Sequence, residues 1–357
     1  MDRINEDFRW RKKTRKDPGG GGVRISWLLV FVWIALGACG QEKTYTNPIA
    51  DGVYMGDPFM IHHEGVYYLY GTTNSGEGFR CWSSRDLQEW NPEGFVFRES
   101  EETWGGSNFW APEVHHLDGK FYLAFSCKGR EAEHDRMLLC LAESDSPTGP
   151  FKEVYAPWFD MGYSCIDAHL FFDDDGKKYL YFDRVGYEGE WPDGHLYGLV
   201  YCRELNEKMA PVGDTVFVSG PEQEWEHPLS DNSRCNEGSY IMKHDGRYYM
   251  TYSANHYRDP FYGIGVSTAD HPLGPWTKSE DNPLIGLDKE REIFGPGHNC
   301  FMRSPDGSEL FIVYHTHVSE ENKQREVNID RVKFDETGRL LVKGPTRTPQ
   351  PVPSGTK

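Results

Sequence analysis

Five stretches of the chain repeat one pattern: an apolar run, a short turn that ends in glycine, and a run rich in tyrosine or phenylalanine. The turn glycines are Gly65, Gly119, Gly176, Gly246 and Gly307, and the intervals between them are 54, 57, 70 and 61 residues. Most of these turns end in Asp-Gly, which tolerates the positive φ that a tight hairpin needs. Each interval has room for about four short strands, the content of one propeller blade. The repeats predict an all-β fold, a five-bladed β-propeller with four-stranded antiparallel blades around an axial channel.

Composition and chain length agree with this interpretation. Aromatic residues make up 14% of the 357 residues, with 38 Gly and 22 Pro, which is typical of many short strands joined by turns. We assign residues 48–345 to the propeller and residues 346–357 to a C-terminal tail. The segment 325–342 is expected to pair with the N-terminal segment, which would close the ring and remove exposed strand edges.

The N-terminus has the features of a secretory signal. A basic segment precedes an apolar run of 14 residues, Ile25–Ala38, which is shorter than the roughly 20 residues of a membrane span. The sequence LGAC, Leu36–Cys39, is similar to a bacterial lipobox and implies cleavage before Cys39 and lipidation of its thiol. A plain signal peptide is the alternative. We therefore expect a signal peptide (1–38), a tether (39–47) and a secreted periplasmic or outer-membrane lipoprotein of a bacterium, which contacts a membrane only through this anchor.

Charge and cysteine content restrict the partners. The net charge of −18 argues against a nucleic-acid partner, because phosphate binding requires a basic surface. With Cys39 as the anchor, seven cysteines remain, and none has the CxxC spacing of a metal site. We expect buried free thiols, with one or two disulfides as the alternative in an oxidising compartment. We expect a monomer without an organic cofactor.

One position in each repeat lies 8 or 9 residues before the turn glycine. Its occupants are Asp57, Ala111, Asp167, Glu237 and His298. The innermost strands of a propeller line the axis, so equivalent positions should form a ring. Three acids and a histidine on one ring are electrostatically costly, because like charges raise each other's pKa. A functional role is therefore favoured over the alternatives, turn caps or a structural cation site.

Three carboxyl groups at one site meet the needs of glycosidic-bond hydrolysis. One acid protonates the departing oxygen, and a second activates water or attacks the anomeric carbon. A third carboxylate can keep the pKa of the acid high through charge repulsion.

The motifs also resemble a known family. In chain order, GDPFMIHHEGVYYLYGTT, WAPEVHHLDGKFYLAFS, IDAHLFFDDDGKKYLYFD, NEGSYIMKHDGRYYMTYS and GPGHNCFMRS are similar to glycoside hydrolase family 43 over almost the whole mature chain. The resemblance implies a five-bladed propeller and single-displacement hydrolysis with inversion at the anomeric carbon. The third and fourth motifs read IDAH and NEGS where a proline is common, but both keep the carboxylate.

The resemblance also assigns roles to individual residues. It makes Asp57 the general base, Glu237 the general acid, and Asp167 the residue that modulates the pKa of the acid and orients it. It implies a calcium or similar ion near the axis, bound through His298. Since one imidazole cannot hold a hard cation alone, waters would have to complete its shell. Arg325 is the best match to an arginine that contacts the sugar.

Other candidates come from the second repeat. Trp110 and Phe109 are a candidate sugar-stacking platform, because aromatic faces suit the apolar face of a sugar; a place in the core is the alternative. Glu113 is expected to bond the backbone rather than substrate. We assign no chemistry to the pair His115 and His116.

We predict an inverting glycosidase that removes terminal pentoses, α-L-arabinofuranosyl or β-xylosyl, from plant polysaccharides or their oligosaccharides. An endo-arabinanase or a galactan-acting enzyme is an alternative, as is a non-catalytic sugar-binding propeller. A retaining fructosidase is disfavoured, because the sequence Gly56–Phe59 does not match its nucleophile motif. A phosphorylase is disfavoured because the propeller repeats contain no cluster of basic residues for phosphate.

Overall fold

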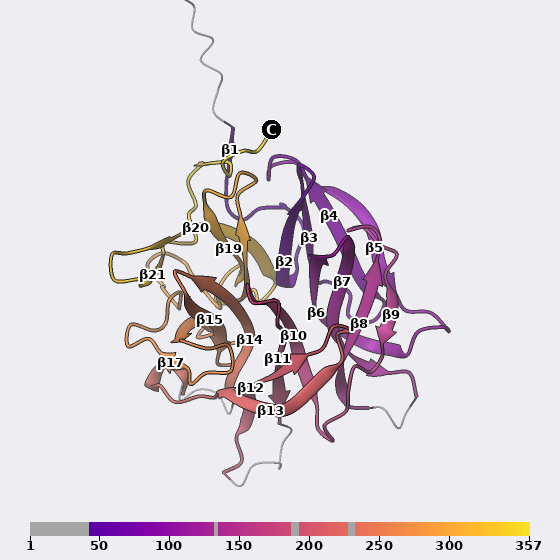
Figure 1. Ribbon diagram of the computed structural model, residues 1–357. Helices are drawn as coiled ribbons and strands as arrows, with labels where there is room; N and C mark the ends of the chain where they lie inside the picture. Colours follow the sequence, from indigo (N-terminus) through magenta and orange to yellow (C-terminus); the bar gives the residue numbers. More distant parts are fainter. Residues whose placement is uncertain (1–42, 132–134, 187–192, 228–232) are drawn as a thin grey trace, which may run out of the picture. The chain divides into compact units, whose positions relative to one another are not determined.

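The computed structural model describes residues 43–131, 135–186, 193–227 and 233–357, and almost all of their regular structure is β-strand (Figure 1). The one helix in these segments is a 3₁₀ turn, η2 (Glu224–Glu226). No helix in them is long and apolar enough to cross a membrane. The predicted signal peptide, tether residues 39–42 and lipidation site Cys39 lie outside the described residues.

The strands form five antiparallel blades of four strands each, as predicted. Blade one consists of β2 (Gly56–His63), β3 (Val66–Thr72), β4 (Gly78–Ser84) and β5 (Asn91–Arg98). Blade two consists of β6 (Gly105–Leu117), β7 (Lys120–Gly129), β8 (Met137–Ser144) and β9 (Lys152–Tyr155). Blade three consists of β10 (Cys165–Phe172), β11 (Lys178–Val185), β12 (Leu196–Leu205) and β13 (Pro211–Ser219). Blade four consists of β14 (Ser233–His244), β15 (Arg247–Ala254), β16 (Gly263–Ala269) and β17 (Thr277–Lys278). Blade five consists of β18 (Gly297–Arg303), β19 (Leu310–His317), β20 (Arg325–Phe334) and β21 (Leu340–Val342).

Blades three and four share one sheet, which the repeat pattern did not predict. The start of β12 pairs in parallel with the start of β14, and Leu196 lies opposite Ser233. The two blades are therefore joined into an eight-stranded sheet, while the other three blades are separate four-stranded sheets.

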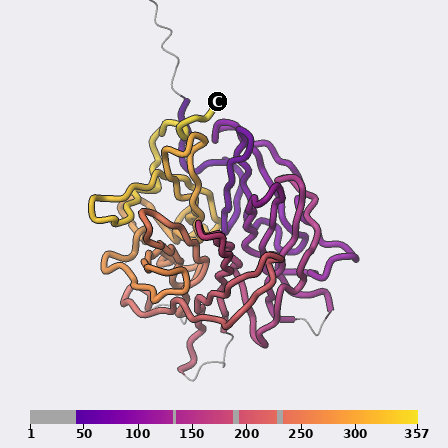
Figure 2. Tube along the Cα trace, in the orientation of Figure 1, coloured from indigo at the N-terminus to yellow at the C-terminus, as the bar shows by residue number. Residues whose placement is uncertain are grey.

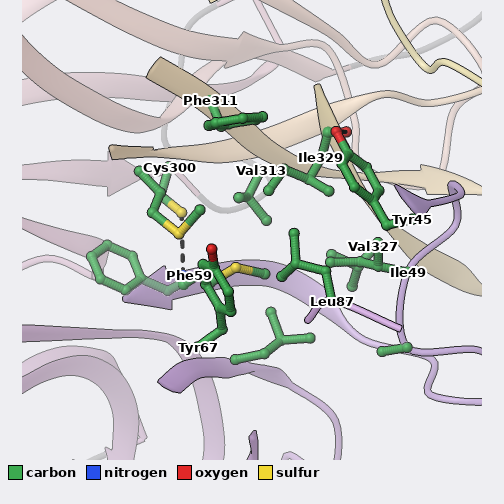
Figure 3. Packing of buried hydrophobic residues seen from close by; sticks show 14 of the residues in the cluster. Tyr45, Ile49, Phe59, Tyr67, Leu87, Cys300, Phe311, Val313, Val327 and Ile329 are labelled. Atoms are coloured by element: carbon green, nitrogen blue, oxygen red, sulfur yellow. Dashed lines mark hydrogen bonds between the residues drawn. The ribbon is translucent and has the colours of Figure 1, made fainter. Parts of the chain in front are cut away.

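The hydrophobic core lies in the seams between blades rather than on the axis. Five clusters of buried apolar side chains are present, and each joins two neighbouring blades, including blade five with blade one. Figure 2 shows the chain passing once around the ring in sequence order. Figure 3 shows the seam between blades five and one, where Phe59 and Tyr67 face Phe311 and Val313, and the amide of Met60 donates to Cys300 Sγ at 3.3 Å. This arrangement leaves the axis available for polar side chains.

The two ends of the described chain meet where the ring closes. Strand β1 (Thr44–Tyr45) pairs with β22 (Gln350–Pro351), so part of the predicted C-terminal tail is a strand (Figure 1). The predicted contact between residues 325–342 and the N-terminal segment is present as a bridge between Ile49 and Val327. The remainder of β20 pairs with β19 and β21 of its own blade.

All seven cysteines after Cys39 are free, and all but Cys235 are buried. The sulfurs of Cys127 and Cys140 lie 3.6 Å apart, well beyond the roughly 2.05 Å of a disulfide. The expectation of buried free thiols is confirmed.

Candidate active site

Each innermost strand carries a β-bulge at the same place. The register of β2, β6, β10, β14 and β18 with the second strand of its blade shifts there. The bulge residue has a positive φ in every blade: Asp57 (53°), Ala111 (47°), Asp167 (57°), Gly238 (56°) and His298 (43°). Such a conformation is uncommon for residues other than glycine. A bulge interrupts the ladder and re-aims a side chain, which explains how these residues reach the axis.

In each blade the backbone N–H of the bulge residue does not bond to the neighbouring strand. It donates a hydrogen bond to a side chain of the preceding blade. The acceptors all lie on second strands, seven or eight residues after the turn glycine. The five hydrogen bonds are Asp57 N to His315 Nδ1 (3.3 Å), Ala111 N to Thr72 Oγ1 (2.8 Å), Asp167 N to Ser126 Oγ (2.9 Å), Gly238 N to Asp183 Oδ2 (2.7 Å) and His298 N to Ser253 Oγ (2.7 Å). Adjacent blades therefore fix the backbone of the site together.

This geometry corrects the predicted register of Glu237. The bulge residue of blade four is Gly238, and Glu237 pairs with Ser253 one residue earlier. Its counterparts in the other blades are Gly56, Trp110, Ile166 and Gly297, which pair with Thr72, Ser126, Asp183 and His315. Counting back from the turn glycine misplaced the acid, because the distance from bulge to turn is 8 residues in blade four and 9 in blades three and five.

Asp57 is paired with cationic and imidazole groups. Its Oδ1 lies 3.0 Å from Arg325 Nη1 and 3.4 Å from His298 Nδ1. Burial alone would raise the pKa of Asp57, but Arg325, followed by His298 and His315, lowers it well below its ordinary value. Gly56 makes room for this contact, because a Cβ there would lie 1.8 Å from the guanidinium carbon of Arg325. Asp57 is thus held as a carboxylate, the state that a general base needs.

Glu237 has the opposite environment. Burial raises its pKa to about 7, the negative charge of Asp57 adds to this increase, and Tyr262 and Arg325 oppose it. The Tyr262 hydroxyl donates to Glu237 Oε1 at 2.8 Å. Near neutral pH Glu237 can therefore hold a proton while Asp57 remains ionised, a difference that suits one acid and one base.

Asp167 has a carboxyl neighbour that the sequence analysis missed, Asp183. Asp183 is 0% exposed, and its Oδ2 accepts the N–H of Gly238. Its Oδ1 is buried and has no hydrogen-bond partner among the described residues. Burial raises the pKa of both groups well above the usual range; Asp183 contributes further to the shift of Asp167, and Glu237 to the shift of Asp183.

A second buried acid, Glu113, lies within hydrogen-bond distance of two histidines. Glu113 Oε2 lies 2.9 Å from His169 Nδ1 and 3.0 Å from His115 Nε2, so its main partners are side chains rather than the expected backbone. The three groups have the proximity of metal ligands. However, His169 Nε2 accepts the N–H of Ile241 at 3.0 Å, so Nδ1 carries the proton and offers no lone pair. A hydrogen-bonded network explains the cluster without a metal.

The oxygens around His298 do not form a calcium shell. Calcium takes six to eight oxygen ligands at 2.3–2.6 Å. The carboxylate of Asp57 is paired with Arg325, Glu113 Oε2 is occupied by two imidazoles, and Asp167 Oδ2 lies 3.7 Å from His298 Nδ1. Calcium at His298 stays a prediction, and water molecules would have to be its other ligands.

The structure separates the two candidate sugar-stacking residues. Phe109 is 0% exposed and packs against Phe79 and Phe125 in the seam between blades one and two, so its proposed contact with sugar was wrong. Trp110 is half-buried and occupies the counterpart of the Glu237 position in blade two. Trp110 therefore remains a candidate for substrate contact.

Comparisons with known proteins identify the family of this chain. Residues 45–340 match the family Glycosyl hydrolases family 43. A thermostable family-43 glycoside hydrolase has a crystal structure that is similar to this fold with a TM-score of 0.82 and 43% identity, covering 87% of this chain and 100% of that one. An extracellular exo-α-(1→5)-L-arabinofuranosidase of Streptomyces chartreusis is 28% identical, over 80% of this chain and 86% of its own length. A β-D-galactofuranosidase of Aspergillus niger is also 28% identical, over 83% of this chain and 84% of its own length.

Proposed function

Because the chain belongs to glycosyl hydrolase family 43, and is therefore a glycoside hydrolase, we propose that it removes terminal pentose residues with inversion of configuration. The sugar is α-L-arabinofuranosyl or β-xylosyl, at the end of a plant polysaccharide or its oligosaccharide. One contrast supports the mechanism above all others. The Asp57 carboxylate lies 3.0 Å from the Arg325 guanidinium, which lowers its pKa, whereas Glu237 has the Tyr262 hydroxyl as its partner and burial raises its pKa to about 7.

In the proposed reaction Asp57 accepts a proton from a water molecule as the water oxygen bonds to the anomeric carbon. The bond between that carbon and the glycosidic oxygen breaks on the opposite face, and Glu237 gives its proton to the departing oxygen. Asp167 is the proposed modulator and positioning group of the acid, the role that the resemblance to the family implies. Arg325 and Trp110 are the proposed sugar contacts. Inversion requires the two carboxyl groups to lie roughly 6.5–9.5 Å apart, leaving room for the water.

The pentose assignment rests on relatives. The Streptomyces chartreusis relative is named for terminal arabinofuranosyl units, and a solved structure named as an endo-1,4-β-xylanase of Bacteroides thetaiotaomicron is 32% identical with a TM-score of 0.70. An endo-arabinanase or a galactan-acting enzyme is the second candidate. A further relative, from Bacillus subtilis, is named as an endo-arabinanase, at 24% identity.

The test is sugar release from nitrophenyl pentosides and from arabinan, xylan and galactan oligomers, with NMR detection of the first anomer. Release of single pentoses of inverted configuration would support the proposal. Internal cleavage would favour the endo-acting alternative. Retention of configuration would overturn the mechanism, and binding of oligosaccharides without turnover would indicate a sugar-binding propeller.

We also propose export and anchoring through a lipid on Cys39, with the propeller acting as a monomer. The support is the LGAC sequence and the two Streptomyces relatives named as extracellular. Cys39→Ser should move the protein from the membrane fraction to the soluble fraction of the producing cell, and an unchanged distribution would contradict the anchor.

A further inference from the structure

Glu237 is not free to turn within the site, because one of its two oxygens is held by Tyr262. The Tyr262 hydroxyl donates to Glu237 Oε1 at 2.8 Å. Tyr262 is 1% exposed and immediately precedes β16, on the loop that follows β15. Burial raises the pKa of Tyr262 well above its usual range, and the charge of Glu237 adds to this shift. The phenol therefore stays protonated and acts as the donor.

The ring of Tyr262 is fixed by two neighbours in blade five. It stacks on the His315 ring, with centroids 5.8 Å apart and planes inclined by 8°. Gly297 leaves the space that the ring fills, because a Cβ there would lie 1.9 Å from Tyr262 Cε1. The Tyr262 backbone is also held, since its amide donates to the carbonyl of Asp259 at 3.0 Å.

His315 connects this aromatic pair to the general base. Its Nδ1 accepts the backbone N–H of Asp57 at 3.3 Å. A continuous path therefore runs from the backbone of Asp57 through His315 and Tyr262 to the carboxyl of Glu237. The parts of this path have few alternative positions, because every residue in it is buried or part-buried and packed.

We propose that Tyr262 is a positioning residue that holds Glu237 Oε1 and so leaves Oε2 as the oxygen that carries and delivers the proton. This inference rests on the proposed function of Glu237 as the general acid. When Oε2 gives its proton to the glycosidic oxygen, Glu237 becomes a carboxylate. The hydrogen bond from Tyr262 then strengthens, because hydrogen bonds to ionised acceptors are stronger than neutral ones. Tyr262 thus stabilises the charge that develops during proton transfer.

Several other groups act on the same carboxyl. Asp57 on β2 and Arg325 on β20 shift the pKa of Glu237 in opposite directions, and Asp167 on β10 and Asp183 on β11 are coupled to it electrostatically. Tyr262→Phe leaves all four of these groups in place and keeps the stacked ring. It removes only the donor, so changes in the pH profile can be assigned to that hydrogen bond.

The experiment compares wild type and Tyr262→Phe on an arabino- or xylo-oligosaccharide and on the matching nitrophenyl pentoside. We expect kcat on the oligosaccharide to fall roughly 10- to 100-fold, the loss expected for a hydrogen bond to a charged group, with KM little changed. The nitrophenyl substrate should lose much less, because its leaving group needs little protonation. Loss of a bond that favours the ionised acid should also move the basic limb of the pH profile to higher pH.

Tyr314→Phe is the matched control, because Tyr314 donates to Asp330 Oδ2 at 2.8 Å in a buried bond away from the site. It should lower the melting temperature without moving the pH profile. Gly297→Ala is a second probe, since its methyl group would displace the Tyr262 ring; it should reproduce the kinetic effects of Tyr262→Phe.

The outcomes separate the inference from the proposed function. If wild type cleaves glycosides and Glu237→Gln is impaired, yet Tyr262→Phe keeps wild-type kcat and pH profile, the role of Tyr262 is wrong. If wild type cleaves no glycoside, or Glu237→Gln is fully active, the proposed function itself fails. Equal losses on both substrates for Tyr262→Phe would indicate general disruption and also count against a positioning role.

Discussion

Gly238 occupies in blade four the bulge position that Asp57 occupies in blade one: both have a positive φ, and both donate their N–H to the preceding blade. The absence of a side chain at 238 matters, because a Cβ there would lie 3.0 Å from Nδ1 of His298. The bulge residue of blade four therefore leaves room for the His298 ring. The acid of this blade is the residue before the bulge, Glu237. The proposed general base and general acid therefore come from different register positions of two repeats.

Replacing the general acid should affect substrates according to their leaving groups. Glu237→Gln should reduce cleavage of oligosaccharides by roughly 10²- to 10⁴-fold, the usual contribution of general acid catalysis. Nitrophenyl pentosides should be affected much less, because nitrophenolate departs without a proton. The measurement is kcat for both substrates, and similar losses on both would argue against the acid role.

The pH dependence of kcat/KM should reflect the same carboxyl. Because the pKa of Glu237 is about 7, activity should decrease as the pH rises through that value and the acid loses its proton. The acidic limb should lie well below pH 4, since the pKa of Asp57 is depressed. A pH–rate profile of the wild-type enzyme checks both limbs. If the basic limb persists in Glu237→Gln, a group other than Glu237 causes it.

Gly56→Ala should disturb Asp57 indirectly, through its partner Arg325. The added methyl group would overlap the Arg325 guanidinium and separate it from Asp57. The pKa of Asp57 should then rise, and the acidic limb should move to higher pH, as it should in Arg325→Met. The control is Gly76→Ala, where the nearest atom to a new Cβ is Asn74 Oδ1 at 3.6 Å. An unchanged acidic limb in both Gly56→Ala and Arg325→Met would contradict the assigned pairing.

Asp183→Asn should stabilise the protein at neutral pH. The pKa of Asp183 is higher in the folded state than in the unfolded state. Between these two pKa values the folded state binds more protons than the unfolded state. The free energy of unfolding therefore falls as the pH rises through that interval. An asparagine can still accept the N–H of Gly238, and it carries no charge at any of these pH values. The melting temperature of the variant should exceed that of wild type at pH 7–8 and match it near pH 3. Asp118→Asn, in an exposed turn, is the control, and lower stability of Asp183→Asn at pH 8 would contradict the raised pKa of Asp183.

Removal of divalent cations should have little effect, because the protein oxygens near His298 are already paired. We expect dialysis against EDTA to leave the melting temperature and kcat/KM unchanged. A decrease in either that calcium reverses would instead support a hydrated ion at His298.

The fold was predictable because each hairpin has its own local signal. Asp-Gly or a similar turn between an apolar and an aromatic run identified all five inner hairpins, and Asp57, Asp167 and His298 were placed at the correct bulge positions. Glu237 was misplaced because turn length varies between blades. Phe109 was misassigned because β6 contains three register shifts between Gly105 and Glu113, so alternation along the strand does not report which face is buried.

Other members of the site had no motif of their own. Asp183 lies on a second strand, where the other blades have Thr72, Ser126, Ser253 or His315; aligning that position across the repeats would have revealed the extra carboxyl. Tyr262 comes from a loop outside the repeat pattern. Its contact with Glu237 depends on three-dimensional packing against His315, which sequence spacing does not encode.

The hydrogen bond from Asp57 to His315 joins the first blade to the last. Asp57 is therefore aligned only when the first and last blades have met, and Asp57 is the residue that we propose activates water. A partly assembled ring would expose its seams but could not hydrolyse a glycoside. Recovery of activity during refolding would then report the final closure of the ring, whereas tryptophan fluorescence and circular dichroism would also record the blades that assemble before it.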